Sequence, residues 1–355
     1  EKDLPYSGKH LRECYQIGMD RFGWKQRQNQ PRSHRDGRWL VGWGMATSTY
    51  PGYRSPGAAK VRLLADGTAV VSSATQDLGT GTYTTMTQVA ADALGIPPER
   101  IKAELGDSTL PPAPVSGGSM TTASVTPAVQ AAAEDALRKV IRCAIEDENS
   151  PLHGMAESQL VARDGAVSVA GREPKVSYAD VLKSRKLPMI EGAAQVAPGA
   201  EMKQYAFHSF GAQFSEVRVD SETGEVRIAR HVGVFDVGRV INTKTARSQA
   251  LGGITWGIGM ALLEHTVYDK KHGRVITNNL ADYAVPVNAD IPNIDVAFVD
   301  QPDFISNSVG ARGIGEIGIT GVAPAIGNAI YHATGIRVRD LPITPDKLLA
   351  GNLRG

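Results

Sequence analysis

The hydrophobic residues of this chain follow two spacings, which predict strands in some segments and helices in others. Apolar residues that alternate with polar ones, or run together over a few positions, predict strands over 39–47, 59–64, 68–73, 212–219 and 226–234. The Asp66-Gly67 pair and the segment 221–224 separate neighbouring runs and are typical of hairpin turns. A further hairpin is predicted over 160–169.

Apolar residues that recur at roughly helical spacing predict helices between these strands. The predicted helices cover 4–24, 83–94, 127–145, 178–183, the segment after Asn242, and 323–334. Ser7 is the expected N-cap of the first helix. Gly95 and Gly335 follow the last periodic residues of two others, where a C-terminal glycine belongs. The order of strands and helices predicts the α+β fold class, in which strands and helices are mixed along the chain.

The length of 355 residues exceeds what one hydrophobic core usually organises, so we predict two α/β subdomains. A helix and linker are expected over 1–37, a first subdomain over 38–199 and a second over 200–355. The linker carries a basic stretch from Lys25 to Arg38. Because this stretch has no helical period, we interpret it as solvated chain rather than a binding patch.

The charge balance and the few cysteines exclude several classes of protein. Lysine and arginine (38) nearly cancel aspartate and glutamate (37), so neither nucleic acid nor a membrane is an expected partner. Cys14 and Cys143 are too few for an iron–sulfur cluster or a Cys₄ zinc site, and the eight histidines lack ligand spacing. We therefore predict no metal ligand among the side chains. The first residue, Glu1, is not methionine, and we expect the chain to begin inside a larger protein.

Segments rich in glycine, serine and threonine each precede a predicted helix. They cover 76–82, 116–124, 236–242 and 310–318. The first N–H groups of a helix lack intrahelical partners and, together with the helix dipole, attract anions such as phosphate. One such loop also arises where glycine merely ends a helix, but four of them favour a shared ligand that contains a pyrophosphate.

The last of these loops contains Glu316 inside a formal match to the dinucleotide pattern GxGxxG, over 313–318. We interpret the match as coincidental, because the carboxylate would face the pyrophosphate and no buried parallel strand is predicted before the loop. Glu316 itself has two interpretations, a carboxylate that stabilises a helix N-terminus or a general base held in a glycine frame. The residues alone leave both open.

Several segments, in the same order, resemble the xanthine dehydrogenase and aldehyde oxidase family. The resembling segments are 77–81, 236–242, Gly252-Gly253 with Gly257, 310–316, 323–330, 334–337 and 341–345. The resemblance extends over nearly the whole chain from about Leu11. It is to the C-terminal part of the molybdopterin-binding large subunit, and among its members to bacterial aldehyde oxidoreductases of the periplasmic type.

The resemblance implies a molybdenum–molybdopterin cofactor, in the cytosine dinucleotide form, held by the glycine loops. The residues implied to bind it are Gln76, Gly79, Thr80, Gly81, Ser119, Thr122, Ala123, Ser124, Val125, Arg239, Val240, Ile241, Asn242, Thr243, Lys244, Thr245, Arg312, Gly313, Ile314 and Gly315. Met120 follows Ser119 where many relatives have arginine, so the chain departs from the family pattern in that loop.

The resemblance also implies that Glu316 is the catalytic base of a molybdenum hydroxylase. Such an enzyme oxidises aldehydes to carboxylic acids, or hydroxylates an N-heterocycle such as a purine, with water as the oxygen source; an aldehyde is the favoured substrate. The implied partners are an iron–sulfur subunit, an FAD subunit and the N-terminal half of the large subunit, which has no counterpart here. The chain alone is therefore expected to be inactive. Relatives occur in the bacterial periplasm or cytoplasm, so no compartment is predicted.

Two other functions remain as alternatives. A non-catalytic assembly module would use the small residues between Gly252 and Ala261 to dock partner chains without a cofactor. A nicotinamide-dependent dehydrogenase rests on the GxGxxG match alone. Arg54 either reaches a substrate pocket or is a surface residue, and we expect a surface residue.

Overall fold

The computed structural model describes residues 3–169, 172–351 and 353, and its contacts divide the chain into two compact units. Unit 1 comprises Glu1–Ser7, Gly52–Phe207 and Pro302–Gly313, and unit 2 comprises Gly8–Pro51, His208–Gln301 and Ile314–Gly355. Both units combine sheets with helices, which confirms the predicted fold class. The predicted domains are sequential segments, whereas each unit is assembled from three separate stretches.

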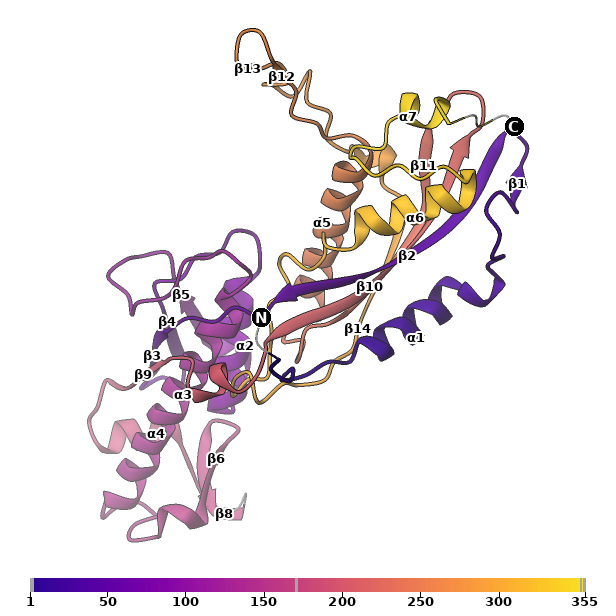
Figure 1. The fold of residues 1–355 in the computed structure, drawn as a ribbon. Helices are drawn as coiled ribbons and strands as arrows, with labels where there is room; N and C mark the ends of the chain where they lie inside the picture. The colour runs from indigo at the N-terminus through magenta and orange to yellow at the C-terminus, as the bar shows by residue number, and fades with distance from the viewer. Residues whose placement is uncertain (1–2, 170–171, 352, 354–355) are drawn as a thin grey trace. The chain divides into compact units, whose positions relative to one another are not determined.

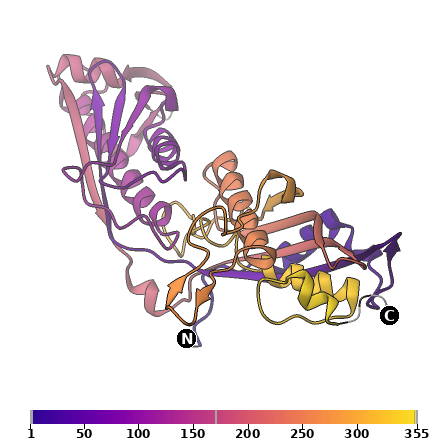
Figure 2. The ribbon, with the colours of Figure 1, turned by 90° about the horizontal axis from the view of Figure 1, so that it is seen from above.

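The main sheet of unit 1 has the strand order β5-β4-β3-β9 (Figures 1 and 2). Its strands are β3 (Gly57–Leu64), β4 (Ala69–Ser72), β5 (Ile101–Glu104) and β9 (Met189–Val196). β3 is antiparallel to β4 and β9. β4 is parallel to β5, because helix α2 (Thr82–Leu94) forms the crossover between them. The long helix α3 (Thr121–Glu146) packs against β9 and β3.

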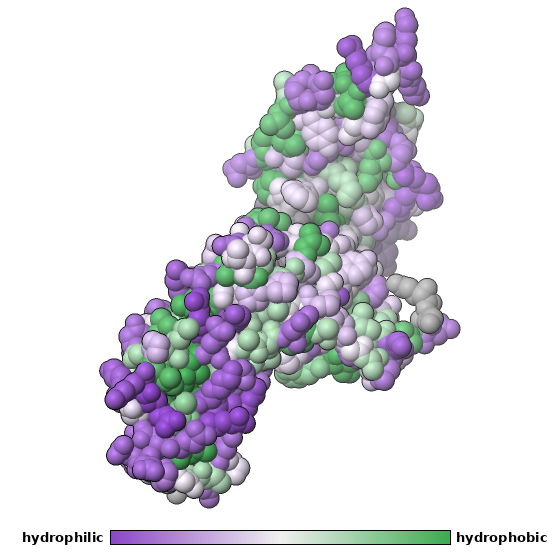
Figure 3. Space-filling model, turned by 90° about the vertical axis from the view of Figure 1, so that its left-hand side faces the viewer, coloured by the Kyte–Doolittle hydropathy of each residue, from purple (hydrophilic) through white to green (hydrophobic). Residues whose placement is uncertain are grey.

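Unit 1 also contains a small three-stranded sheet in the order β6-β7-β8. Its strands are β6 (Leu160–Arg163), β7 (Ala166–Val169) and β8 (Arg172–Ser177). Helix α4 (Tyr178–Ser184) follows, and its N-cap Ser177 accepts a hydrogen bond from the Asp180 N–H. Figure 3 shows mostly hydrophilic side chains over the lower end of unit 1 in that view. Short 3₁₀ helices lie at Pro98–Arg100, Glu157–Gln159 and Ala200–Lys203.

The sheet of unit 2 has the strand order β1-β2-β10-β11-β14. Its strands are β1 (Arg35–Asp36), β2 (Trp39–Pro51), β10 (His208–Asp220), β11 (Val226–Asp236) and β14 (Asn293–Phe298). Neighbours from β1 to β11 are antiparallel, and β14 is parallel to β11. The helices of this unit are α1 (Leu11–Phe22), α5 (Thr243–Leu262), α6 (Val322–Thr334) and α7 (Pro345–Leu349). Shorter elements are the hairpin β12 (Tyr268–Asp269) and β13 (Arg274–Val275), and 3₁₀ helices Trp24–Gln26 and Asn288–Asp290.

The two faces of this sheet carry different helices, because successive side chains of a strand point to opposite faces. On one face Phe214 belongs to a hydrophobic cluster with Cys14 and Phe22 of α1. On the other face Val217 and Val219 belong to a larger cluster with α5 and α6. Figure 1 shows α1 and α6 on opposite sides of β2 and β10.

A glycine in a strand allows close contact with a helix in each unit. A Cβ atom added to Gly44 of β2 would lie 2.1 Å from the Ala329 nitrogen of α6. A Cβ atom added to Gly192 of β9 would lie 2.1 Å from the Ala132 oxygen of α3. Real Cβ atoms do not approach backbone this closely, so only glycine permits these helix positions.

The predicted strands and most helices agree with the structure within a few residues, and two helix starts were wrong. The first helix begins at Leu11, and the Ser7 hydroxyl donates to Asp303 at 2.6 Å instead of capping it. Helix α3 begins at Thr121, six residues before the predicted start, and includes Pro127. In this position the proline removes one i→i−4 hydrogen bond and crowds the carbonyl group of Ala123, and the helix nevertheless continues through it.

The basic stretch 25–38 lies exposed on unit 2 but is fixed to it by specific contacts. The Arg27 and Arg32 side chains donate to the backbone oxygens of Trp43 and Thr334, at 3.1 and 2.6 Å. Arg38 forms an ion pair with the buried Asp220 at 3.0 Å. Among the described residues, no helix has the length and apolar character needed to span a bilayer.

We expect Gly192→Ala to destabilise unit 1 by about 3 kcal/mol, because the new methyl group forces α3 away from β9. Gly117→Ala is the matched control, since a Cβ atom there meets nothing within 4 Å. Urea unfolding followed by circular dichroism measures both variants. Equal stability of the two variants would contradict the close helix–strand contact.

Candidate functional site

Loops predicted to bind one ligand come together in unit 1. The Ser116 N–H donates to the Gln76 side-chain oxygen at 3.2 Å, which joins loop 76–81 to loop 116–120. Gly313 lies directly on the second loop, since a Cβ atom added to it would be 2.5 Å from the Ser119 oxygen. Gln76, Ser119 and Gly313 therefore lie close together although they come from three distant parts of the sequence. One ligand could contact them only if they were close.

Asp77 gives the first loop its shape. Its carboxylate accepts hydrogen bonds from the N–H groups of Gly79 (2.9 Å), Gly81 (3.1 Å) and Tyr83 (3.3 Å). Burial on its own raises the pKa of the Asp77 carboxyl, but the backbone donors, Gly81 first, together hold it below its ordinary value. The N–H groups of Gly79 and Gly81 thus already have an acceptor, and Thr80 bonds Thr82 through their hydroxyls.

The second predicted segment, 122–125, forms the first turns of α3 and is mostly buried. The exposed fractions of Ala123, Ser124 and Val125 are 3%, 3% and 1%. The Ser124 hydroxyl accepts the Ser55 N–H at 3.0 Å. Within unit 1, these three side chains pack in the interior, while Thr122 and Ser119 keep partial exposure.

Arg312 is buried and paired with an acid of its own unit. Its guanidinium donates to Asp303 at 2.8 Å, and the two side chains are 1% and 2% exposed. Asp303 also accepts from Ser7 and from the Ser306 N–H. A buried ion pair that loses one partner is strongly destabilising, so Arg312 fixes the segment 302–313 whatever else it contacts.

The third predicted segment, 239–245, leads into α5 of unit 2. The Asn242 side chain caps the helix by accepting the Thr245 N–H at 2.9 Å. The Val240 N–H donates to Asp300 at 2.9 Å. Arg239, Thr243 and Lys244 are exposed here, so two cations lie at the positive end of a 20-residue helix.

Glu316 lies in a run of turns, and the interpretation as a helix-capping carboxylate is wrong. The turns extend over 315–321, and α6 begins only at Val322, after Gly321. The Tyr50 hydroxyl donates to a carboxylate oxygen of Glu316 at 2.6 Å. Tyr50 is the last residue but one of strand β2 and is itself partly buried. A charge-assisted bond of this length fixes the direction of the carboxylate.

The backbone that follows Glu316 is in contact with the sheet and with α5. The Gln213 amide donates to the oxygens of Gly318 (3.1 Å) and Thr320 (3.2 Å), and Ser48 donates to Thr320 at 2.5 Å. A Cβ atom added to Gly253 of α5 would be 2.7 Å from the Gly318 backbone. The small residues of α5 are thus used inside unit 2.

His231 lies behind Gln213 and is fully buried. Its Nε2 is 2.8 Å from the Gln213 side-chain oxygen, and its Nδ1 is 2.7 Å from the Ser215 hydroxyl. Burial lowers the pKa of His231 to about 3, so the imidazole is neutral at physiological pH. Gln213, Ser215 and His231 are each 0% exposed, which makes this a polar cluster inside a hydrophobic core.

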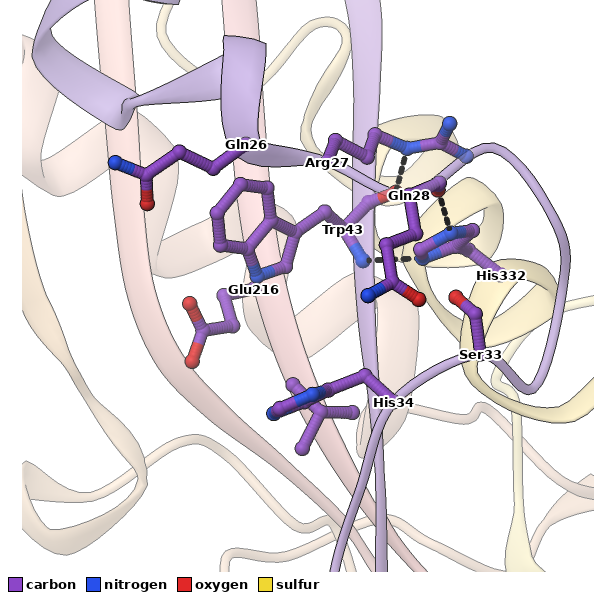
Figure 4. A pocket seen from close by; sticks show the side chains of 9 residues that line it. Gln26, Arg27, Gln28, Ser33, His34, Trp43, Glu216 and His332 are labelled. Carbon is purple, nitrogen blue, oxygen red and sulfur yellow. Dashed lines mark hydrogen bonds between the residues drawn. The ribbon is translucent and has the colours of Figure 1, made fainter.

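A separate pocket of about 240 Å³ in unit 2 contains none of the predicted residues. Trp43, His332 and Gln28 line it together with the basic stretch (Figure 4). His332 accepts the Trp43 N–H at 3.0 Å and donates to the Gln28 oxygen at 2.6 Å. Burial above all lowers its pKa, so we assign His332 to linking the basic stretch, β2 and α6.

The structure overturns the expectation for Arg54. Its side chain is 7% exposed, pairs with Glu201 at 2.8 Å and lies over the Phe207 ring. Arg54 is therefore an interior residue of unit 1. The GxGxxG match also lacks its required surroundings, because residues 299–314 contain no strand and no helix follows before Val322.

Among the described residues, no group of three or more His, Cys, Asp or Glu side chains could hold a metal ion. Tyr50, Gln213 and His231 were not singled out from the sequence. A strand register would have been needed to find the last two, since Gln213 and His231 lie on neighbouring strands.

Comparisons with known proteins identify relatives over most of the chain. The family model of the molybdopterin cofactor-binding domain matches residues 18–292. The chain is 41% identical, over 344 residues, to the aldehyde oxidoreductase molybdenum-binding subunit PaoC of Escherichia coli (strain K12), which covers 97% of this chain and 45% of PaoC. It is 30% identical to the probable hypoxanthine oxidase XdhD of the same strain, covering 96% of this chain and 34% of XdhD.

Solved structures share the fold. The crystal structure of quinoline 2-oxidoreductase from Pseudomonas putida 86 matches with a TM-score of 0.85 at 22% identity, covering 97% of this chain and 46% of that one. The chain spans about half the length, or less, of the curated relatives that it matches.

We expect Gly253→Ala to destabilise unit 2 by about 3 kcal/mol and to shift the Gly318 backbone, because no room exists for the added methyl group. Gly252→Ala is the control on the same helix. Its added Cβ atom meets nothing within 4 Å, and alanine favours the helix by about 1 kcal/mol. Urea unfolding compares the two, and a Gly253→Ala variant as stable as Gly252→Ala would argue against this packing.

We expect stability to fall below pH 6.5 in a way that depends on His231. The unfolded chain takes up a proton near pH 6.5, whereas the folded chain does so only near pH 3. The contribution of neutral His231 is therefore complete above pH 6.5 and lost as the pH falls, by about 2 kcal/mol at pH 5. Urea unfolding at pH 7.5 and 5 should show a smaller pH effect in His231→Gln. An equal pH effect in both proteins would refute the buried neutral imidazole.

Proposed function

The chain belongs to the molybdopterin cofactor-binding domain family, and from this premise we propose that it is the cofactor-binding part of a molybdenum-dependent oxidoreductase whose base is Glu316. The resemblance inferred from the sequence motifs is confirmed by these comparisons. The observation that carries the proposal is the carboxylate of Glu316, held by Tyr50 on a backbone segment that is itself fixed.

The donor groups of the converging loops are compatible with a phosphate-bearing pterin. As the structure describes it, helix α3 begins without a side-chain cap and without an acid in its first turn. At the start of α2 the Asp77 carboxylate already accepts the Tyr83 N–H. Ser119, Thr122 and Gln76 supply hydroxyl and amide donors in unit 1, and Arg239 and Lys244 supply charge at α5 in unit 2. Gly313 allows its loop to approach Ser119 closely. In each unit by itself, these features suit a phosphate group.

Not every assigned residue has the same role in this proposal. Ala123, Ser124, Val125 and Arg312 are buried in unit 1, so they shape the cradle rather than touch the cofactor with their side chains. Gly79 and Gly81 direct their N–H groups to Asp77. The remaining assigned residues are proposed as contacts. They are Gln76, Thr80, Ser119, Thr122, Arg239, Val240, Ile241, Asn242, Thr243, Lys244, Thr245, Gly313, Ile314 and Gly315.

The cofactor, held by the residues proposed above as contacts, would supply a two-electron oxidant and would activate water. Glu316 would accept a proton at a carboxylate oxygen during the oxidation of the substrate. The Tyr50 hydroxyl stabilises the Glu316 carboxylate and holds one of its oxygens in place. The carboxylate therefore keeps a constant orientation. The hydrogen bonds of Gln213 and Ser48 to the segment after Glu316 restrict movement of the loop.

An aldehyde, converted to a carboxylic acid, is the proposed substrate, since the 41% identical relative is named an aldehyde oxidoreductase subunit. A purine-type heterocycle is the second candidate, because XdhD is named a probable hypoxanthine oxidase. The cytosine dinucleotide form, the iron–sulfur and FAD partner subunits, and inactivity of this chain by itself also remain proposals. They follow from the family and from the share of the relatives that the chain covers.

The assembly module is less well supported, because its docking residues Gly253 and Gly257 are in contact with Gly318 and Val322. The dehydrogenase alternative rests on a loop without the flanking strand and helix that nicotinamide binding uses.

We expect Glu316→Gln in the full-length holoenzyme to lower kcat by about 10²- to 10⁴-fold, because the amide keeps the size but cannot take up a proton. Tyr50→Phe should lower kcat about tenfold, since the carboxylate loses one charge-assisted hydrogen bond. Steady-state kinetics with an aromatic aldehyde, normalised to molybdenum content, measures both.

Tyr15→Phe is the matched control. The Tyr15 hydroxyl also forms a hydrogen bond, with Thr47 of strand β2, but Tyr15 lies outside the site. Full activity of Glu316→Gln with molybdenum retained would reject the base and favour the assembly module. Absence of NAD binding in a titration of the chain would exclude the dehydrogenase.

A further inference from the structure

The segment 317–322 is a stretch of irregular backbone directly after Glu316. Ile317, Gly318 and Val322 are buried, and residues 319–321 are partly exposed. The Ile319 oxygen accepts the Val322 N–H in a turn, whereas no strand or helix is described as supplying a donor to the carbonyl groups of Gly318 and Thr320. Buried carbonyl oxygens need donors. Two of them, on Gly318 and Thr320, receive the hydrogens of one side chain, Gln213.

The orientation of the Gln213 amide follows from these partners. A carbonyl oxygen only accepts, so the NH₂ group of Gln213 must face Gly318 and Thr320. Its oxygen then faces His231 Nε2 at 2.8 Å, and that nitrogen must carry the hydrogen. Because the imidazole is neutral, Nδ1 is an acceptor and takes the Ser215 hydroxyl hydrogen at 2.7 Å. Each hydrogen in this series of hydrogen bonds has one acceptor. All the bonds point the same way, from Ser215 through His231 and Gln213 to the segment after Glu316.

The strand register makes this series possible. Ser215 of β10 lies directly opposite His231 of β11, and Gln213 lies opposite Gly233. A Cβ atom added to Gly233 would be 2.9 Å from the Gln213 oxygen. The glycine therefore leaves the space in which the glutamine reaches across to His231.

We propose that Ser215, His231 and Gln213 form a positioning relay, which sets the place of Glu316 by holding the carbonyl groups of Gly318 and Thr320. The inference rests on the proposed role of Glu316. Gln213 and His231 touch no reacting atom and act only through the backbone. A simpler core would fill these three buried positions with apolar residues, which would leave both carbonyl groups without these donors.

The test uses Gln213→Met in the full-length holoenzyme, with kinetics normalised to molybdenum content. Methionine has a similar size but no donors. We expect kcat to fall by about tenfold to a hundredfold, as a misplaced catalytic group does, with an unchanged KM. Hydrogen exchange of the amides over 317–321 should become faster. If Gln213→Met yields no holoenzyme, Gln213→Asn keeps the same groups on a side chain too short to reach both partners.

Phe214→Leu is the matched control on the next residue of β10. Phe214 faces α1, so this variant lowers stability without touching the Glu316 segment, and its kcat should stay at the wild-type value. A purely structural Gln213 would behave in the same way, with reduced stability and unchanged kcat, and that result would overturn the proposal.

A double-mutant cycle with Glu316→Gln separates the two hypotheses. If Gln213 acts through Glu316, Gln213→Met lowers the residual activity of Glu316→Gln by less than about twofold. Full additivity would overturn the relay. Wild-type activity of Glu316→Gln alone would instead reject the base, and an inactive Glu316→Gln beside a fully active Gln213→Met would reject only the relay.

Discussion

Burial of an irregular backbone is the constraint on which the candidate site depends. Between Ile317 and Val322 the chain is buried at Ile317, Gly318 and Val322 and lacks a ladder of backbone hydrogen bonds, so side chains supply the donors for Gly318 and Thr320. Gln213 and Ser48 do so from the sheet, and Gly253 admits the segment close to α5. The polar cluster in the core, the small residues of α5 and the fixed direction of Glu316 are consequences of that one requirement.

The local pattern of the chain was sufficient to predict most of the elements. The Asp66-Gly67 turn, the long β10–β11 hairpin and the helix ends at Gly95 and Gly335 depend on residues close in sequence, and the structure has them. The start of α3 was missed because Pro127 resembles a first helical residue, although the helix includes it in its second turn. Ser7 was misassigned because its partner, Asp303, lies 296 residues away.

The candidate site was predictable where glycine loops carry it and hidden where strand pairing builds it. Gln76, Ser119 and Gly313 were selected from the sequence, and they come together in unit 1. Tyr50 and Gln213 could not be selected from the sequence, because their roles come from hydrogen bonds to residues of the turn 315–321. The sequence did not distinguish His231 from the other single histidines. The strand pairing that places His231 opposite Ser215 is what brings it into contact with Ser215 and Gln213.

The interleaved composition of the two units bears on how the polypeptide is made. The chain passes between the units after Ser7, Pro51, Phe207, Gln301 and Gly313. During synthesis, unit 1 lacks the Arg312–Asp303 pair until residue 312 is made, and unit 2 lacks α6 until residue 334 is made. The hydrophobic core of unit 2 therefore stays open until its last long helix is available, which exposes apolar surface that chaperones bind.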